Sequence, residues 1–559
     1  MNDLRFAFRQ LLKNPGFTAA AVLTLALGIG ATTTIFSVVY AVLLRPLPYR
    51  EPERLVQLYE TGLRAGGSRD SRDWVSFPNF LDWRRENQVF EDVAAYRYWP
   101  FTVAGDGTPE TVLGLQVTSG LFSVLGVHPS LGRTFVPEED QPGKGNVAIL
   151  SYGLWQRRFG GSQSIAGRPI TIDGQSCTIV GVMPDGFQFP YGVPGEVALR
   201  GIDLWIPMRN PEVQYRSNRN YWAVARLKRG VTLERAQLNM DAIGAAIAQQ
   251  YPNENRDLGV KVTSLQQHLT REVNQPLWIL LGAIGMVLLI ACDNLASLLL
   301  SKVNARLREM AVRAALGASR FRLVRQSLTE ACLLSVAGAA VGLLLAVWAV
   351  ESFRRLGPAN IPRLQERYAE IYVPHLQVPS FASALVVRTR GNPMAMAGII
   401  SKEVASQDPT LALFNVHPML ELVATAQARR RFQAALLGAF AGLALVLAEV
   451  GIYGVIAYWM SQRVREIAIR MAVGARQIDV LWLIVRHGLV LTAGGLALGL
   501  AGTAAMSRFI GSLLFRTSAA DLRIYAVVCL LLAGVALLAC YFPARRAAKV
   551  DPMVALRAE

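Results

Sequence analysis

The sequence has few of the residues and motifs from which soluble enzymes build their active sites. Only five of its 559 residues are cysteine and five are histidine, and neither set has the close spacing of a metal site or of a disulfide framework. The motifs G-x-x-x-x-G-K-[ST], H-E-x-x-H and G-x-S-x-G are absent. An ATPase, a zinc hydrolase or a serine hydrolase therefore has no support, and we predict no catalytic residue, no cofactor and no metal.

Charged residues are also scarce, at 17% of the chain, and hydrophobic residues make up 52%. The net charge of +17 on its own would suggest nucleic-acid binding. The lysines and arginines, however, cluster beside apolar runs, as they do in the cytoplasmic loops of membrane proteins. No recognised nucleic-acid module is present. These features predict a membrane protein whose partner is the lipid bilayer and not a nucleic acid.

Long apolar runs recur along the chain. The first begins at Gly16 and is far longer than the core of about 7–15 residues in a cleaved signal peptide, so we expect a retained span. The six predicted transmembrane helices are residues 17–44, 277–300, 328–350, 434–460, 481–506 and 524–542. The basic segments that flank them, which we expect in the cytoplasm, are an amphipathic interfacial helix at 1–16, the loops 301–327 and 461–480, and the tail 543–559.

Two polar regions separate the spans. Residues 46–275 contain short alternating runs typical of strands, such as 147–150 and 177–183, and an amphipathic helix at 233–251. Residues 351–433 form a smaller region with a predicted strand at 383–389 and a predicted helix at 393–407. The predicted fold class is thus a membrane α-helical bundle of about six transmembrane helices with an α+β extracytoplasmic domain.

One short basic segment occurs twice. RLREMAVRAALGA (306–318) returns as RVREIAIRMAVGA (463–475), and Glu309 is followed 157 residues later by Glu466. Arginines after a span can serve only to fix its orientation, but that does not explain the matched Arg-Glu pair or the Gly-Ala ending. We expect each copy to be a short helix along the membrane that ends at its glycine and offers its charges to a cytoplasmic partner. The residues concerned are Arg308, Glu309, Arg313 and Gly317, then Arg465, Glu466, Arg470 and Gly474.

Two acidic residues lie inside apolar runs, Asp293 and Glu449. A charge within a span costs at least about 2.5–3.5 kcal/mol on insertion scales, so such residues usually face a bundle interior or water. One interpretation is an ion-linked or proton-linked site. The alternative, which we favour, is that each acid lies near the cytoplasmic end of its span and reaches towards the interface.

Several stretches resemble the MacB/FtsX family of ABC transporter permeases, especially its duplicated "orphan" members. They include FPNFLDWRREN (77–87), LFSVLGVHPSLGRTF (121–135), both basic repeats and PARRAAKVDPMVALR near the end of the chain. The resemblance implies a MacB-like periplasmic core domain between the first two spans. It also implies that the two basic segments are coupling elements which dock on a separate, homodimeric ABC ATPase, so that ATP hydrolysis drives motion of the periplasmic domain.

Duplicated members of that family have two halves of four spans, each half with a full periplasmic domain. Relative to that pattern, the chain lacks two adjacent spans and most of the second domain, so we expect residues 351–433 to be the remnant of a second periplasmic region. The resulting expectation is a permease of the bacterial inner membrane that serves efflux or mechanical signalling, with a periplasmic partner protein. The alternatives are a membrane sensor that regulates envelope proteins and a secondary transporter that works through Asp293 or Glu449.

Overall fold

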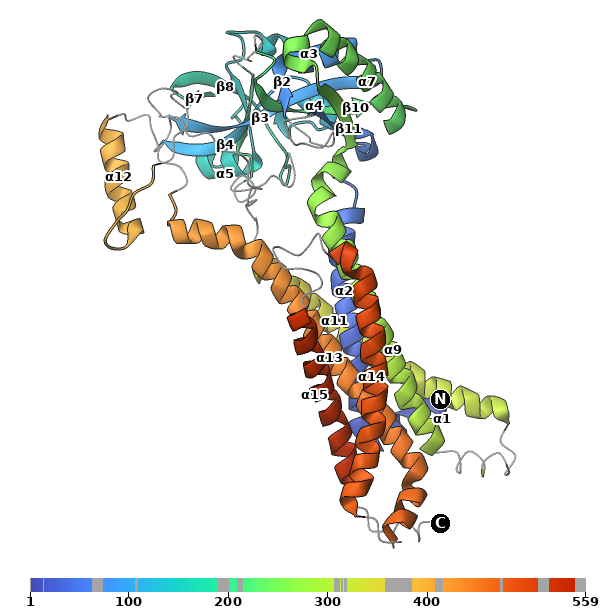
Figure 1. Cartoon of the computed structure of the whole chain (residues 1–559). Coiled ribbons are helices and arrows are strands. Elements are labelled where there is room, and N and C mark those ends of the chain that lie inside the picture. Colours follow the sequence, from blue (N-terminus) through green and yellow to red (C-terminus); the bar gives the residue numbers. More distant parts are fainter. Residues whose placement is uncertain are drawn as a thin grey trace. The chain divides into compact units, whose positions relative to one another are not determined.

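A computed structural model of the chain describes residues 2–13, 15–62, 74–105, 109–189, 201–208, 215–305, 312, 315, 319–356, 385–407, 416–472, 476–510 and 522–547. The chain divides into two compact units, a sheet unit and a helical unit (Figure 1). The sheet unit comprises Leu43–Glu272 and Pro358–Arg431. The helical unit comprises Met1–Val42, Val273–Gly357 and Phe432–Glu559.

The sheet unit is built on a mixed sheet whose main path has the order β11-β1-β10-β3-β4-β9-β6-β8-β5, with β2 and β7 paired beside it. Two pairs, β4 with β9 and β6 with β8, are parallel, and the others are antiparallel. The strands are β1 (Leu55–Gly62), β2 (Val75–Ser76), β3 (Phe90–Ala104), β4 (Glu110–Val117), β5 (Leu131–Gly132), β6 (Val147–Leu150), β7 (Pro169–Ile172), β8 (Gln175–Val182), β9 (Leu204–Pro207), β10 (Arg219–Leu227) and β11 (Leu258–Ser264). The strands predicted at 147–150 and 177–183 are confirmed.

Short helices cover this sheet: α3 (Phe77–Glu86), α4 (Leu121–Leu125), α5 (Tyr152–Phe159), α7 (Leu233–Gln250) and α8 (Pro252–Asn255). The helix predicted at 233–251 is confirmed as α7. Thr232 caps it by accepting a hydrogen bond from the Arg235 amide. Its buried side is a stripe at helical spacing that runs from Ala236 to Ile247. Gly244 lets α7 approach β11 closely, because a Cβ there would lie 3.2 Å from Val260 Cγ2.

Three hydrophobic clusters fill the sheet unit. One lies under α3 and α7 and contains Trp83 and Tyr221. A second surrounds Trp205, and a third surrounds Trp155 and Phe101. The large aromatic side chains in these clusters are almost wholly buried, so the unit has a core of its own.

The smaller polar region, residues 351–433, contributes one complete described helix and no described strand to the sheet unit. The predicted helix at 393–407 is confirmed as α12 (Pro393–Gln407). The predicted strand at 383–389 is wrong for its described part, since residues 385–389 join no sheet. The side chains of Leu385 and Val386 are 72% and 74% exposed. A strand needs a partner for its backbone groups, and alternation of apolar residues does not supply one.

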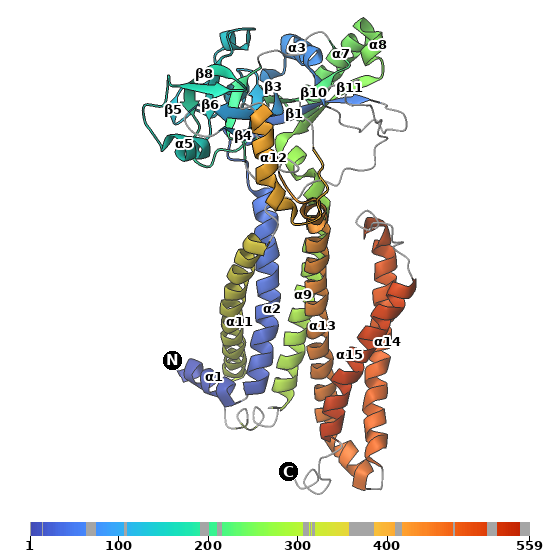
Figure 2. The same ribbon diagram turned by 90° about the vertical axis from the view of Figure 1, so that its left-hand side faces the viewer.

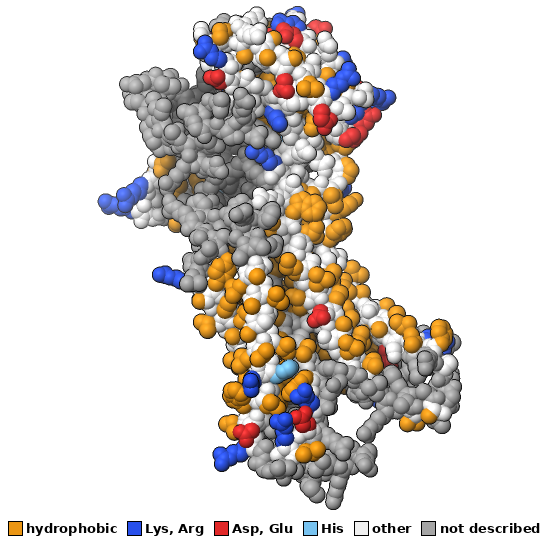
Figure 3. All heavy atoms as spheres, turned by 45° about the vertical axis from the view of Figure 1, so that its right-hand side comes forward, with side chains coloured by type: hydrophobic (Ala, Val, Ile, Leu, Met, Phe, Trp, Pro, Cys, Tyr) orange, Lys and Arg blue, Asp and Glu red, His pale blue; other side chains and the backbone are white. Residues whose placement is uncertain are grey.

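The helical unit contains α1 (Asn2–Lys13), α2 (Pro15–Val39), most of α9 (Leu265–Ala305), α11 (Arg320–Leu356), most of α13 (Met419–Ala472), α14 (Gln477–Ile510) and α15 (Leu522–Ala547). Five stretches of the described helices are long and apolar enough to cross a membrane: Pro15–Leu44, Leu277–Val303, Val324–Ser352, Ala434–Ile456 and Leu481–Thr503. Within α15, the stretch Tyr525–Tyr541 is apolar but shorter. Hydrophobic side chains cover most of the described surface of this unit in Figure 3, and charged side chains gather near its lower end.

Helices α2 and α11 lie side by side and pack through small residues (Figure 2). A Cβ at Gly342 would lie 2.9 Å from the carbonyl oxygen of Ala26, and one at Gly30 would lie 3.0 Å from the carbonyl oxygen of Gly342. Such close approach requires small side chains on both helices. The spacing of Gly338 and Gly342 is therefore a helix-packing motif.

Candidate functional site

The described part of the second basic segment, residues 463–472, is the end of α13, which runs without interruption from Met419 to Ala472. The prediction of a separate short helix for this copy is therefore wrong. Residues 455–472 contain no glycine or proline that would end the helix. The Glu466 carboxylate accepts a hydrogen bond of 2.7 Å from Arg470, one turn further along, and this pair stabilises the helical extension.

The charged side chains of this extension face outwards. The side chains of Arg463, Glu466 and Arg470 are 48%, 43% and 54% exposed. Arg465 lies in α13, but its side chain is outside the described part, and Gly474 is outside it altogether. The extension thus presents both basic and acidic side chains on one regular helix.

An aromatic contact fixes the base of the extension to the next helix. The Trp459 ring of α13 stacks on the His487 ring of α14, with centroids 4.7 Å apart and planes 17° from parallel. The Arg463 guanidinium lies 4.6 Å from the centre of the Trp459 ring, within range of a cation–π interaction. The Arg463 guanidinium thus lies against a ring contact that joins α13 to α14.

The first basic segment lies largely outside the described residues, and Arg308, Glu309, Arg313 and Gly317 are among those not described. Its two flanking helices are joined by a buried ion pair. Lys302 Nζ of α9 lies 2.7 Å from Glu330 Oε2 of α11, and both side chains are about nine-tenths buried. The Lys302 ammonium also lies 4.8 Å from the ring centre of Phe17 in α2, so this cluster holds three helices together.

The 157-residue offset relates these two contacts to each other. Lys302 corresponds to Trp459, and Glu330 corresponds to His487. Each pair joins the helix before a basic segment to the helix after it, by an ion pair in one copy and by ring stacking in the other. Neither pair was predicted, although extending the repeat beyond the basic segments would have aligned the four residues.

Helices α9 and α13 meet at positions that the repeat also relates. Asn294 is buried, and its Nδ2 donates a hydrogen bond of 2.6 Å to the carbonyl oxygen of Leu447. A Cβ at Gly451, the counterpart of Asn294, would overlap Asn294 Oδ1. Ile290 packs near its own counterpart, Leu447. Contact between equivalent positions is the mark of a pseudo-twofold interface.

The two intramembrane acids lie apart from this interface. Asp293 and Glu449 are on exposed faces of α9 and α13, and neither makes an ion pair within the described part of the chain. The buried polar side chain of this span is the neighbouring Asn294. Among the residues that the structure describes, no three His, Cys, Asp or Glu side chains converge as metal ligands would.

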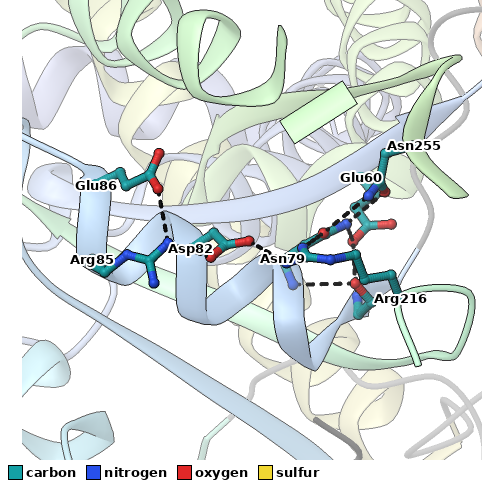
Figure 4. A network of polar contacts seen from close by, with 8 residues as sticks. Glu60, Asn79, Asp82, Arg85, Glu86, Arg216 and Asn255 are labelled. Atoms are coloured by element: carbon teal, nitrogen blue, oxygen red, sulfur yellow. Dashed lines mark hydrogen bonds and ion pairs between the residues drawn. The ribbon is translucent and has the colours of Figure 1, made fainter. Parts of the chain in front are cut away.

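The sheet unit holds a buried polar network, drawn in Figure 4. Glu60 of β1 is 1% exposed and accepts hydrogen bonds from the Ser76 amide at 2.9 Å and from Asn79 Nδ2 at 2.8 Å. Arg219 of β10 forms an ion pair with the same carboxylate. Burial of a carboxylate is tolerated only with such partners, so this network binds β1, β10 and α3 into one body.

The network continues along α3. Arg216 Nη2 lies 2.7 Å from Asp82 Oδ2, and the Arg216 guanidinium lies 3.6 Å from the ring centre of Tyr251. Asp82 also accepts a hydrogen bond of 2.9 Å from Arg85. The hydrogen bond from Arg85 to Glu86, with the charge of Asp82, raises the pKa of the Arg85 guanidinium. Each acid is held by an arginine, which favours a structural role over acid–base chemistry.

Two family models match stretches of the sequence that belong to the sheet unit and to the helical unit. The family model described as MacB-like periplasmic core domain matches residues 18–243. The model described as FtsX-like permease C-terminal matches two stretches, 281–387 and 438–552. The described residues thus define a multi-pass membrane protein with a mixed-sheet domain of the MacB type. The chain belongs to the MacB/FtsX family of ABC transporter permeases.

Several relatives are exporters. "Macrolide export ATP-binding/permease protein MacB" of Rhodospirillum rubrum is 37% identical over 149 residues, which cover 26% of this chain and 22% of that protein. "Probable syringafactin export ATP-binding/permease protein SyfD" of Pseudomonas syringae pv. tomato is 23% identical over 243 residues, covering 41% and 32%. The chain thus matches a third or less of the length of these relatives. The periplasmic region of MacB from Actinobacillus actinomycetemcomitans aligns with 43% of this chain and 98% of that one, at 11% identity and a TM-score of 0.30.

Proposed function

We propose that the chain is the membrane subunit of an ABC-type exporter or mechanotransmission machine. A separate ATPase hydrolyses ATP, and the chain transmits the resulting motion to its MacB-like domain. Membership of the permease family and the export functions named for its relatives support this proposal. The chain itself contains no phosphate-binding loop of the G-x-x-x-x-G-K-[ST] type.

The observation that carries the proposal is the exposed, charged end of α13. This helix continues beyond the apolar stretch Ala434–Ile456 to Ala472, and Arg463, Glu466 and Arg470 project from it. A partner that binds this end moves a rigid helix rather than a loop. The repeated sequence offers a second site of the same kind at Arg308, Glu309, Arg313 and Gly317. Two such sites suit an ATPase made of two identical subunits.

Helix α9 provides a continuous path from the first basic segment. It begins at Leu265, directly after β11, and ends at Ala305, directly before that segment. A push on the segment therefore acts on one helix that is covalently continuous with the central sheet. Under this proposal the basic segments lie in the cytoplasm, the membrane is the bacterial inner membrane, and the MacB-like domain acts on a periplasmic partner protein or on an amphipathic substrate.

Reversal of charge at the repeated glutamates tests the docking role. The double variant Glu309→Lys plus Glu466→Lys is expected to lose co-purification with a nucleotide-binding subunit from membranes, and to lose stimulation of ATP hydrolysis. The matched control is Glu403→Lys, the same change at an exposed residue of α12, which leaves both properties intact. Unchanged association in the double variant would contradict the proposal. Equal thermal unfolding of the variants excludes misfolding as the cause.

A further inference from the structure

The repeat extends from the basic segments into the helices that follow them, so α11 and α14 can be compared position by position. With the offset of 157 residues, Gly338 and Gly342 of α11 correspond to Gly495 and Gly499 of α14. Both helices therefore carry two glycines four residues apart. This spacing allows a second transmembrane helix to approach closely.

On α11 this face holds a helix of the same chain. A Cβ at Gly338 would lie 2.5 Å from Leu25 Cβ, and one at Gly342 would lie 2.9 Å from the carbonyl oxygen of Ala26. Leu334, one turn before the glycines, is only 1% exposed. The face formed by Leu334, Gly338 and Gly342 is thus filled by α2.

On α14 the corresponding face is open. No described atom lies within 4 Å of a Cβ built at Gly495 or at Gly499. Leu491, the counterpart of the buried Leu334, is 51% exposed. The two helices share the sequence pattern but differ in whether a helix occupies it.

Helix α15 does not take this place, because it packs on a different part of α14. Ile484 is fully buried in a cluster with Cys540 of α15. A Cβ at Gly488 would overlap Cys540 Sγ. The contact with α15 therefore uses residues nearer the start of α14 and leaves Leu491, Gly495 and Gly499 uncovered.

From this comparison we infer that the face of α14 formed by Leu491, Gly495 and Gly499 binds a transmembrane helix of a separate polypeptide, as α11 binds α2. The occupant carries small residues at a four-residue spacing, as α2 does at Ala26 and Gly30. Larger side chains would keep the two backbones apart. This inference does not depend on coupling to an ATPase.

A second copy of the chain cannot supply its own α2 for this purpose. Gly30 of α2 packs on α11, with a Cβ there 3.4 Å from Leu345 Cβ. Gly28 packs on α9, with a Cβ there 2.9 Å from Ala291 Cβ. The two faces of α2 that carry Gly28 and Gly30 are therefore both engaged within its own chain. Since a second copy has no free small-residue face on α2 to offer, we assign the α14 face to a helix of a different polypeptide.

The contact between α2 and α11 provides the probe for a test. The probe is a synthetic peptide of residues 15–44 with Gly30→Cys. The full chain has its five native cysteines replaced by alanine and carries Gly502→Cys, at the counterpart of Leu345. In the contact between α2 and α11, a Cβ built at Gly30 lies 3.4 Å from the Cβ of Leu345. This distance is close to the roughly 3.5–4.5 Å between the Cβ atoms of a disulfide. The matched control places the cysteine at Val490, which is 65% exposed on another side of α14.

In mixed proteoliposomes under mild oxidation, we expect at least ten-fold more cross-linking to peptide at position 502 than at position 490. Gly495→Leu plus Gly499→Leu is expected to reduce cross-linking at 502 to the level seen at 490, while thermal unfolding of the chain without peptide stays unchanged. Equal cross-linking at the two positions would overturn the inference, as would an absence of cross-linking. Disulfide-linked chain dimers through position 502 in preference to peptide would also overturn it, in favour of a second copy.

Discussion

The two halves of the helical unit place related residues at related positions but give them different neighbours. At the base of the first half, Lys302 pairs with Glu330, whereas their counterparts Trp459 and His487 stack as rings. Further along, α11 packs on α2, and α14 packs on α15. The repeat therefore preserves the arrangement of two helices around a basic segment, while the contacts that hold them are specific to each half.

The sheet unit offers a second contrast of the same kind. Its first part has three hydrophobic clusters and a buried polar network. In residues 385–407, no described side chain is buried. A helix such as α12 without a buried face gains little from tertiary packing. The difference shows that local sequence pattern alone does not produce a folded domain, because the pattern needs a second layer to cover it.

The largest expected effect comes from breaking the buried ion pair. Lys302→Met leaves the Glu330 carboxylate buried without its cation, which costs about 3–5 kcal/mol of unfolding free energy. The double variant Lys302→Met plus Glu330→Leu is expected to recover most of this loss. At the corresponding place, His487→Ala removes a ring contact worth about 0.5–1.5 kcal/mol. Denaturant unfolding in detergent measures the unfolding free energy of the three variants. Equal losses for Lys302→Met and His487→Ala would contradict the expected difference between the ion pair and the ring stack.

A smaller effect is expected at the paired glycines. Gly342→Leu forces α2 away from α11 and costs about 1–3 kcal/mol, as overpacking does in other cores. Gly499→Leu, the same change at the counterpart position, is expected to stay within about 0.5 kcal/mol of the parent chain because that face is open. Thermal unfolding of the purified chain compares the two. A large loss in Gly499→Leu would show that the α14 face is already filled.

The pseudo-twofold contact between α9 and α13 is expected to contribute less. Asn294→Ala removes one interhelical hydrogen bond, worth about 0.6–1.7 kcal/mol within a membrane. Gly451→Asn alone places two asparagines against each other. The exchange Asn294→Gly plus Gly451→Asn is expected to restore stability, since the two positions are equivalent across the interface. If the double variant is no more stable towards unfolding than Gly451→Asn alone, the two positions are not equivalent and the pseudo-twofold interface is contradicted.

The smallest effect is expected in the second polar region. Ile399 of α12 is 60% exposed, so Ile399→Ala should change the unfolding free energy by no more than about 0.5 kcal/mol. The matched change Ile247→Ala in α7, where the side chain is 5% exposed, is expected to cost about 2–5 kcal/mol. Comparable losses at the two positions would indicate that α12 is covered by a partner.

Apolar length and periodicity were sufficient to predict five of the six candidate membrane spans, the helix at 233–251 and the mixed α+β domain. The sixth predicted span, 524–542, lies in α15, where the apolar stretch Tyr525–Tyr541 is shorter than the other five. The strand predicted at 383–389 shows the limit, because its described part, residues 385–389, joins no sheet. A strand exists only through a partner that the segment itself does not specify. The buried pairs Lys302–Glu330 and Trp459–His487 depend on two helices that meet in space. An ion pair in one copy corresponds to two stacked rings in the other, so the residue types alone do not mark these positions as equivalent. The constant offset of 157 residues does relate them, because it aligns Lys302 with Trp459 and Glu330 with His487.

The central claim is that both basic segments lie on one side of the membrane and residues 351–433 lie on the other. It is tested most directly by labelling single cysteines at Ser319, Arg476 and Ser401, all exposed, with a membrane-impermeant maleimide in a cysteine-free chain. We predict that positions 319 and 476 react only in inverted membrane vesicles, and that position 401 reacts only in right-side-out vesicles. Reaction of position 401 from the same side as position 476 would contradict the account.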